Sequence, residues 1–104
     1  MRECYHQRID ARLLRLVEAA VSKIDAQSGL RVRMSLNVAR WKNQQARARW
    51  KQLLRLPWQQ LRRQLLADDE TGAALRQDAP MGGILTPAER LKIMREFSDD
   101  ARAA

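Results

Sequence analysis

Residues 35–56, SLNVARWKNQQARARWKQLLRL, constrain the fold of this chain more than any other segment. They contain no proline, glycine or acidic residue and are rich in good helix formers, which predicts one long helix. Trp41 and Trp50 are nine residues apart, so on a continuous helix they would point in nearly opposite directions. A helix that is apolar on two sides is usually packed on two sides. We therefore expect this helix to lie centrally in a small bundle.

The same segment belongs to a strongly basic part of the chain. No Asp or Glu occurs between Ala26 and Ala67, and the formal net charge of the whole chain is +8. On a continuous helix, about 100° per residue would align four cations in one narrow stripe: Arg40, Arg47, Lys51 and Arg55. A cationic ridge of this kind suits a polyanion. The predicted nucleic-acid-binding residues are this stripe and its neighbours Arg33, Lys42, Arg49, Arg62 and Arg63.

Trp41 and Trp50 have two interpretations. Aromatic residues at helical spacing are most often core residues. If one of them is exposed beside the cations, it would instead stack on a base or anchor a partner protein. The sequence leaves both interpretations open.

The composition favours an all-α fold. Gly and Pro together number seven in 104 residues, and Leu, Ala, Arg and Gln are abundant, which predicts helix nearly throughout. The length fits one domain. We expect a bundle of four to five helices over residues 1–97, with a long central basic helix, and a frayed tail over 98–104. The two-sided central helix and modest core predict a homodimer.

Local signals place the helices before the basic segment and the connection into it. Residues 4–27 carry a broad apolar stripe and are followed by Gly29, a typical residue just past a helix end. Residues 30–36 alternate apolar and polar side chains, as strands do. A single short strand has no partner, so we expect an extended linker or an early start of the second helix.

Three later helices follow from proline and capping signals. Pro57 interrupts the basic helix and suits the first turn of a third helix over residues 57–67. The acids at 68–70 mark a junction before a short helix over 71–77. Thr86-Pro87-Ala88-Glu89 is a full capping box, so the last helix starts there. We expect its buried side to contain Leu91, Met94, Ile93 and Phe97.

The sequence offers little catalytic or metal-binding chemistry. Cys4 is the only cysteine, and with His6 it cannot complete a four-ligand zinc site. The pairs Asp68-Asp69 and Asp99-Asp100 resemble ordinary solvated surface acids. Gly82-Gly83 lacks the lysine of a phosphate-binding loop. We therefore expect neither an enzyme, nor a metal site, nor a cofactor.

Two function classes remain after these exclusions. The first is a small nucleic-acid-binding protein that grips the DNA or RNA backbone largely without reading sequence. The second is an interaction subunit, an inhibitor or assembly factor, whose Arg and Trp side chains bind an acidic protein. A helix-turn-helix over residues 57–78 is weaker, since its turn is acidic and Arg76 and Gln77 are its only base readers. With no apolar span and a lone cysteine, we expect a cytoplasmic protein that does not cross a membrane.

Overall fold

The computed structural model describes the backbone of residues 5–103 and the side chains of residues 11–97. Within that backbone there are six α-helices, one 3₁₀ turn and no strand, which confirms the predicted all-α class. The elements in order are α1 (Tyr5–Ala26), the 3₁₀ turn η1 (Ser28–Leu30), α2 (Arg31–Ala39), α3 (Gln44–Leu53), α4 (Trp58–Leu65), α5 (Glu70–Asp78) and α6 (Pro87–Ala103).

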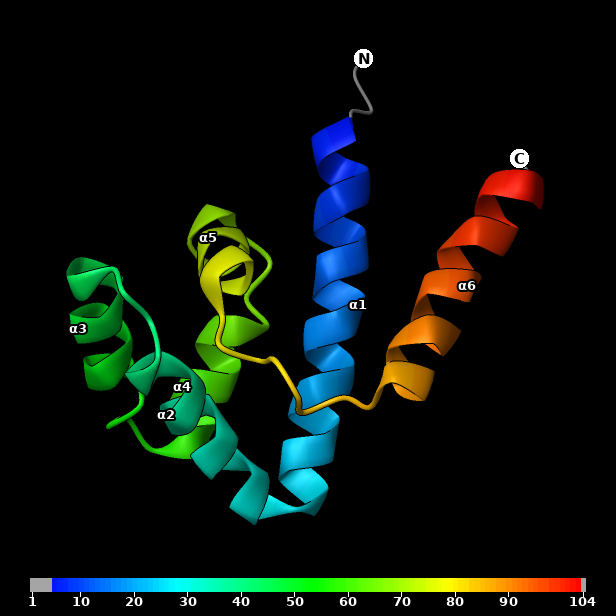
Figure 1. The fold of residues 1–104 in the computed structure, drawn as a ribbon. Helices are drawn as coiled ribbons and strands as arrows, with labels where there is room; N and C mark the ends of the chain where they lie inside the picture. The colour runs from blue at the N-terminus through cyan, green and yellow to red at the C-terminus, as the bar shows by residue number, and fades with distance from the viewer. Residues whose placement is uncertain (1–4, 104) are drawn as a thin grey trace.

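Helix α1 divides the molecule into two parts. The shorter helices α2 to α5 lie on one side of it, and α6 lies on the other (Figure 1). The predicted apolar stripe of α1 is buried in its second half, at Val17, Ala20, Val21 and Ile24. The side chain of Ile9, which belongs to the same predicted stripe, lies outside the described residues.

One core joins α1 to the shorter helices. Each of α1 to α5 contributes at least one fully buried side chain, and so does the connection between α5 and α6. The buried residues beyond α1 are Met34, Val38, Trp50, Leu61, Leu65, Leu75 and Ile84. Removing this much apolar surface from water is the main force that holds such short helices together.

The predicted single helix over residues 35–56 is wrong, and the segment forms two helices. Helix α2 ends at Ala39, and α3 begins at Gln44 after a loop. Asn43 is the N-cap of α3, where its Oδ1 accepts a hydrogen bond of 3.0 Å from the amide of Ala46. An N-cap asparagine satisfies one of the otherwise unpaired amides of a first turn, so it makes a new helix start favourable here.

The break explains why the segment has apolar residues on two sides. On one continuous helix, Met34 and Val38 would point away from Trp50. Because the chain turns between α2 and α3, all three side chains are buried in the same core. The two apolar faces therefore meet one core, and the expectation of a long central basic helix is corrected to two short adjoining helices.

The other predicted helices are present, although the total number of helices differs from the prediction. Residues 31–39 are helical, which confirms the early start of the second helix. The helices expected at 57–67 and 71–77 are present as α4 and α5. With the break in the basic segment, the described chain has six α-helices rather than the predicted four to five.

The start of α6 is confirmed, but its buried side was predicted only in part. The capping box forms, because Thr86 Oγ1 accepts from the Glu89 amide at 3.1 Å and Glu89 Oε1 accepts from the Thr86 amide at 2.7 Å. Ile93 is buried, whereas Leu91 and Met94 are 51% and 36% exposed. Helix α6 makes its main helix contact with α1, on the side of α1 away from the shorter helices, so much of the α6 surface is left uncovered. The helix extends to Ala103, beyond the residue at which we expected the domain to end.

Candidate nucleic-acid interface

The predicted basic residues are spread over α2, α3, α4 and the turns between them. Arg33 is on α2, Arg47, Arg49 and Lys51 are on α3, and Arg62 and Arg63 are on α4. Arg40 and Lys42 flank Trp41 in the α2–α3 loop, and Arg55 follows α3. We call the α2–α4 segment, residues 31–65, the basic lobe.

The proposed four-residue stripe is not continuous. Arg40 is the C-cap of α2, so it does not share a helix with Arg47, Lys51 and Arg55. Only Arg47 and Lys51, which are four residues apart, lie on one side of α3, because Arg55 follows the C-cap of that helix. The helical register that motivated the stripe therefore holds for two of its four members.

Two of the predicted cations are engaged inside the fold. Arg47 Nη1 donates to the carbonyl oxygen of Trp41 at 3.1 Å. Arg62 Nε lies 3.0 Å from Asp25 Oδ2 and 3.2 Å from Oδ1, forming an ion pair between α4 and α1. Side chains that fix a loop or join two helices have less freedom to contact a ligand. We therefore assign both a mainly structural role.

Asp25 is held by two donors at once. Besides the ion pair with Arg62, its Oδ1 accepts a 2.7 Å hydrogen bond from Trp58 Nε1. The Trp58 hydrogen bond and the Arg62 guanidinium lower the pKa of Asp25, because both favour its charged form. The last acid before the basic lobe in the sequence is thus already paired.

Arg31 has a structural role that sequence reasoning missed. Its Nη2 donates to the carbonyl oxygens of Leu54 and Leu56, at 2.8 and 2.5 Å. The same guanidinium lies 5.7 Å from the centre of the Trp58 ring, within range of a cation–π contact. Arg31 therefore satisfies carbonyls beyond the end of α3 and fixes the α3–α4 turn. Only the three-dimensional path of the chain brings these groups together.

Apart from Arg33, six cations of the basic lobe are exposed and make no hydrogen bond or ion pair with any side chain in the described part of the chain. They are Arg40, Lys42, Arg49, Lys51, Arg55 and Arg63. Because the lobe itself contains no Asp or Glu, their positive potentials add without local compensation. They make up the candidate interface. Arg33 is a seventh exposed cation without an ion pair among the described residues, and its guanidinium lies beside Gly83.

The interface is distributed around α3 and not confined to one face. Lys51 and Arg55 line a recess of about 250 Å³ between α2 and α3, together with Ser35, Val38 and Leu54. Arg49 precedes Lys51 by two residues, so it points roughly 160° away around the helix. The exposed cations therefore face at least two directions around α3.

The two tryptophans named as stacking or anchoring residues have different environments. Trp50 is 1% exposed and belongs to the core, so that assignment is wrong for it. Trp41 is half-buried: it packs against the core and also lines an open recess of about 450 Å³ beside the end of α5. Of the two, only Trp41 has ring surface that a ligand can reach.

Arg76 is a second arginine whose role sequence reasoning missed. Its side chain is 2% exposed, and its Nη1 donates to the carbonyl oxygens of Leu65 and Ala67 at 2.9 and 2.8 Å. Leu65 is the last residue of α4 and Ala67 lies two residues beyond it, so Arg76 links α5 to the end of α4. A buried arginine cannot read bases. The helix-turn-helix alternative therefore loses one of its two base readers.

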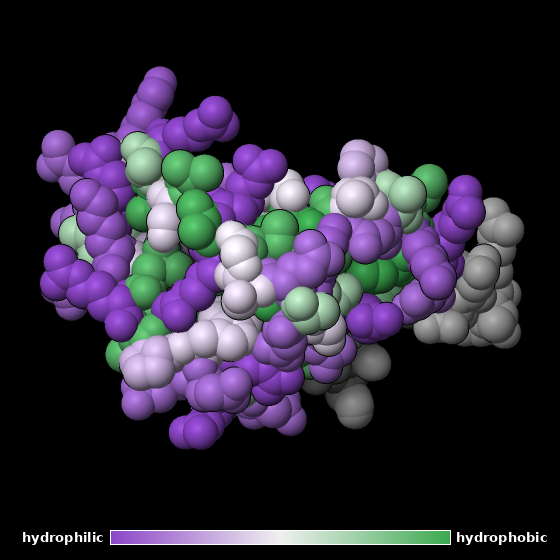
Figure 2. Space-filling view, turned by 90° about the horizontal axis from the view of Figure 1, so that it is seen from below, coloured by the Kyte–Doolittle hydropathy of each residue, from purple (hydrophilic) through white to green (hydrophobic). Residues whose placement is uncertain are grey.

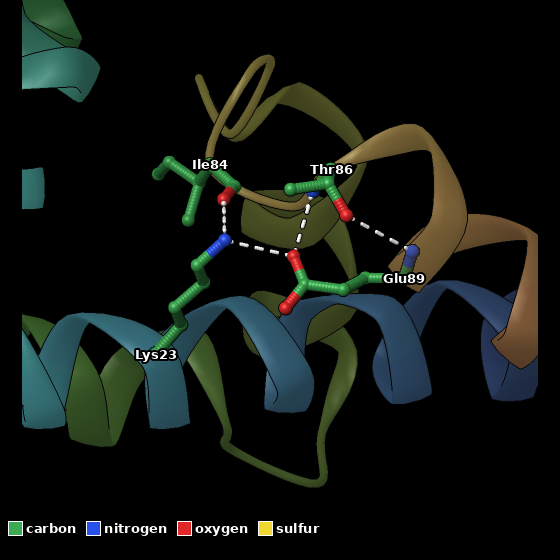
Figure 3. Close-up of polar contacts among 4 residues, drawn as sticks. All are labelled: Lys23, Ile84, Thr86 and Glu89. Atoms are coloured by element: carbon green, nitrogen blue, oxygen red, sulfur yellow. Dashed lines mark hydrogen bonds and ion pairs between the residues drawn. The ribbon is translucent and has the colours of Figure 1, made fainter.

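A polar cluster outside the basic lobe fixes α6 to α1 (Figure 3). Lys23 Nζ donates to the carbonyl oxygen of Ile84 at 2.9 Å and to Glu89 Oε1 at 2.8 Å. The Lys23 hydrogen bond, with the contribution of Thr86, lowers the pKa of Glu89. The cluster connects α1, the turn before α6 and the first turn of α6. Every member is satisfied by another, which is typical of a structural contact.

The remaining sequence candidates gain no support as sites. Among the residues that the structure describes, no three His, Cys, Asp or Glu side chains come together as a metal site would require. The side chains of Cys4, His6, Asp99 and Asp100 lie outside the described residues. No helix of the described chain has the length and apolar character needed to cross a membrane.

Known proteins supply no further guide to this site. No family model matches the chain, and neither the curated proteins nor the solved structures contain a significant match.

Proposed function

We propose that this protein binds nucleic acid through the phosphate backbone, using the exposed cations of the basic lobe. The observation that carries the proposal is the group of six exposed Lys and Arg side chains without an ion pair, on a segment that has no acid of its own. Unopposed cations gathered on one part of a small fold are the usual electrostatic footprint of nucleic-acid binding.

The chemistry of these side chains suits phosphate. Four of the six are arginines, Arg40, Arg49, Arg55 and Arg63. A guanidinium presents a planar set of donors that can bind two phosphate oxygens at once, which an ammonium cannot do. Phosphate contacts set position and affinity but carry no base information. We therefore expect binding largely without sequence preference, to DNA and RNA alike.

A matched pair of lysine substitutions tests this proposal. Lys51→Gln removes one exposed cation of the basic lobe, and Lys92→Gln removes one exposed cation of α6. The net charge of the two variants is the same. We expect Lys51→Gln to weaken binding to oligonucleotides of unrelated sequence, and Lys92→Gln to have little effect, as measured by fluorescence anisotropy at low salt. Equal affinities for both variants and the parent would count against the proposal.

A second candidate function is a protein interface, and the exposed apolar residues of α6 favour it. Leu91 and Met94 line a recess with Leu85 and Pro87, next to the exposed Arg90. Figure 2 shows that hydrophobic patches interrupt the hydrophilic surface on the face seen from below. Apolar residues that cluster at a surface often mark contact with another protein.

This second candidate includes self-association and an acidic protein partner. The interface expected from the sequence used Trp41 and Trp50 as aromatic anchors, and the burial of Trp50 removes one of them. Sedimentation velocity of the protein alone at micromolar concentration tests the first of these, self-association. A single 12.1 kDa species at all concentrations would exclude the homodimer, and Leu91→Ser should abolish any dimer that forms through α6.

A further inference from the structure

The recess beside Trp41 has the features of a nucleobase site. It has a volume of about 450 Å³ and lies where the α2–α3 loop meets the end of α5. Its lining combines the aromatic ring with two amides, a carboxylate and two small apolar residues: Trp41, Asn43, Gln77, Asp78, Ala46 and Ala79. An aromatic wall next to hydrogen-bonding groups can stack on a base and also contact its polar edge.

The loop that carries Trp41 is held in place by the protein itself. The Trp41 amide donates to the Val38 carbonyl at 3.0 Å, and its own carbonyl accepts from Arg47 Nη1 at 3.1 Å. Part of the ring packs against the core. A ring fixed before the ligand arrives loses little freedom on binding, which favours affinity.

The polar groups of the recess have hydrogen-bonding capacity available. Asn43 uses Oδ1 to cap α3, and its Nδ2 makes no hydrogen bond within the described residues. Gln77 and Asp78 are exposed at the end of α5, likewise without a side-chain partner there. Amides and carboxylates are suited to the donor and acceptor pattern of base edges. The Asp78 charge would repel a phosphate, so the recess itself suits a base better than a backbone.

The cations that would bind the phosphates flank Trp41 in the sequence. Arg40 and Lys42 are the sequence neighbours of Trp41, both exposed and without an ion pair in the described part of the chain. Stacking on an aromatic ring combined with cationic contacts to the backbone is the usual way in which proteins hold unpaired nucleotides.

The arrangement fits a single strand better than a duplex. In a duplex the bases are paired and stacked on each other, so none can enter a recess without being unpaired. A duplex backbone is also stiff, whereas the cations around α3 point in different directions. A flexible single strand can follow them and present a free base to Trp41.

We therefore infer that the ligand is single-stranded nucleic acid, one base of which stacks on Trp41 in this recess. The inference rests on the proposed function. The probe that tests it is a short fluorescein-labelled DNA strand of mixed sequence, used alone and annealed to its complement, with the full chain. We expect tighter binding to the single strand. Trp41→Leu should weaken single-strand binding about 5- to 150-fold, while Trp41→Phe retains most of the affinity.

A second pair of variants avoids the core contacts of Trp41. Gln77→Ala changes an exposed side chain in the recess, and Gln59→Ala changes an exposed glutamine on α4. We expect Gln77→Ala to weaken single-strand binding about 2- to 10-fold and Gln59→Ala to leave it unchanged. If Trp41→Leu fails to fold by circular dichroism, this pair decides the question.

The possible failures are distinguishable. If the protein binds both probes in a salt-dependent way but prefers the duplex, or if recess variants bind single strands as the parent does, the recess assignment is wrong and the proposed function stands. If the parent shows no salt-dependent binding to either probe, the proposed function fails and the recess assignment fails with it.

Discussion

Replacing Gly72 by alanine should destabilise this protein, although alanine is the better helix former. Gly72 is buried in α5, and a Cβ built on it would overlap the carbonyl oxygen of Ala67 and lie 2.9 Å from its carbonyl carbon. Real Cβ atoms essentially never approach other atoms so closely. The contacting atoms are backbone atoms, so no side-chain rotation can relieve the overlap.

Both sides of this close approach are held by hydrogen bonds. The Ala67 carbonyl accepts from Arg76 Nη1 at 2.8 Å, and the Gly72 amide donates to Asp69 Oδ1 at 2.7 Å. Separating the two segments to relieve the clash would strain or break these bonds. Such overpacking costs about 1 to 3 kcal/mol, and a weakened hydrogen bond adds about 1 kcal/mol. The higher helix propensity of alanine offsets about 1 kcal/mol of this destabilisation.

We therefore expect Gly72→Ala to lower the free energy of unfolding by about 2 kcal/mol, or the melting temperature by about 8 to 16 °C. Urea and thermal unfolding followed by far-UV circular dichroism measure both quantities. Gly29→Ala is the matched control, because nothing lies within 4 Å of its added Cβ. It should be neutral or stabilising by up to about 1 kcal/mol. A Gly72→Ala protein as stable as the parent would refute the close α4–α5 packing described above.

Three further predictions concern stability. Arg76→Met should cost about 2 to 3 kcal/mol in urea unfolding, because it leaves the carbonyls at the end of α4 without their charged donor. Asn43→Ala should cost about 1 kcal/mol by removing the cap of α3. The folded pKa values of Asp25 and Glu89 are lowered from their ordinary 3.8 and 4.5, so their stabilisation is present above these values and is lost as pH falls through the lowered ones. Acid titrations of Asp25→Asn and Glu89→Gln should therefore show a weaker loss of stability, and an unchanged profile in both would contradict these contacts.

Local signals in the sequence predicted most of the secondary structure. The capping box at Thr86 and Glu89 forms as expected, because a side chain and a backbone amide three residues apart are sufficient for it. Pro57 lies between α3 and α4 for an equally local reason, because proline lacks the amide donor that a helix interior requires. The apolar stripe of α1 was predicted from the helical spacing of its apolar residues, because a helix that packs along one side buries residues at that spacing.

The break in the basic segment was not predicted, because helix propensity alone does not favour it. Nothing between Ala39 and Gln44 forbids a helix, and Asn43 is tolerated in a helix interior. The break is favoured by burying Trp50 together with Met34 and Val38, which is a property of the whole fold. Tertiary packing therefore overrode a local preference.

The candidate site was predicted in part. The sequence marked the basic lobe correctly as a region of unopposed charge, because charge is a property of composition. It could not separate the structural arginines from the exposed ones. Arg31 and Arg76 bind carbonyls 23 to 25 and 9 to 11 residues away, and Arg62 pairs with Asp25 on another helix. Only the folded chain brings these partners together.

The measurement that tests the proposed function most directly is the salt dependence of nucleic-acid binding. Affinity for a single strand should be measured at several salt concentrations, for the parent and for a variant that carries Arg49→Gln, Lys51→Gln and Arg55→Gln. If each cation neutralises one phosphate, the slope of log affinity against log salt should become shallower by about 0.7 per residue, or about 2 in total. A variant with the slope and affinity of the parent would contradict the assignment of these cations to phosphate binding.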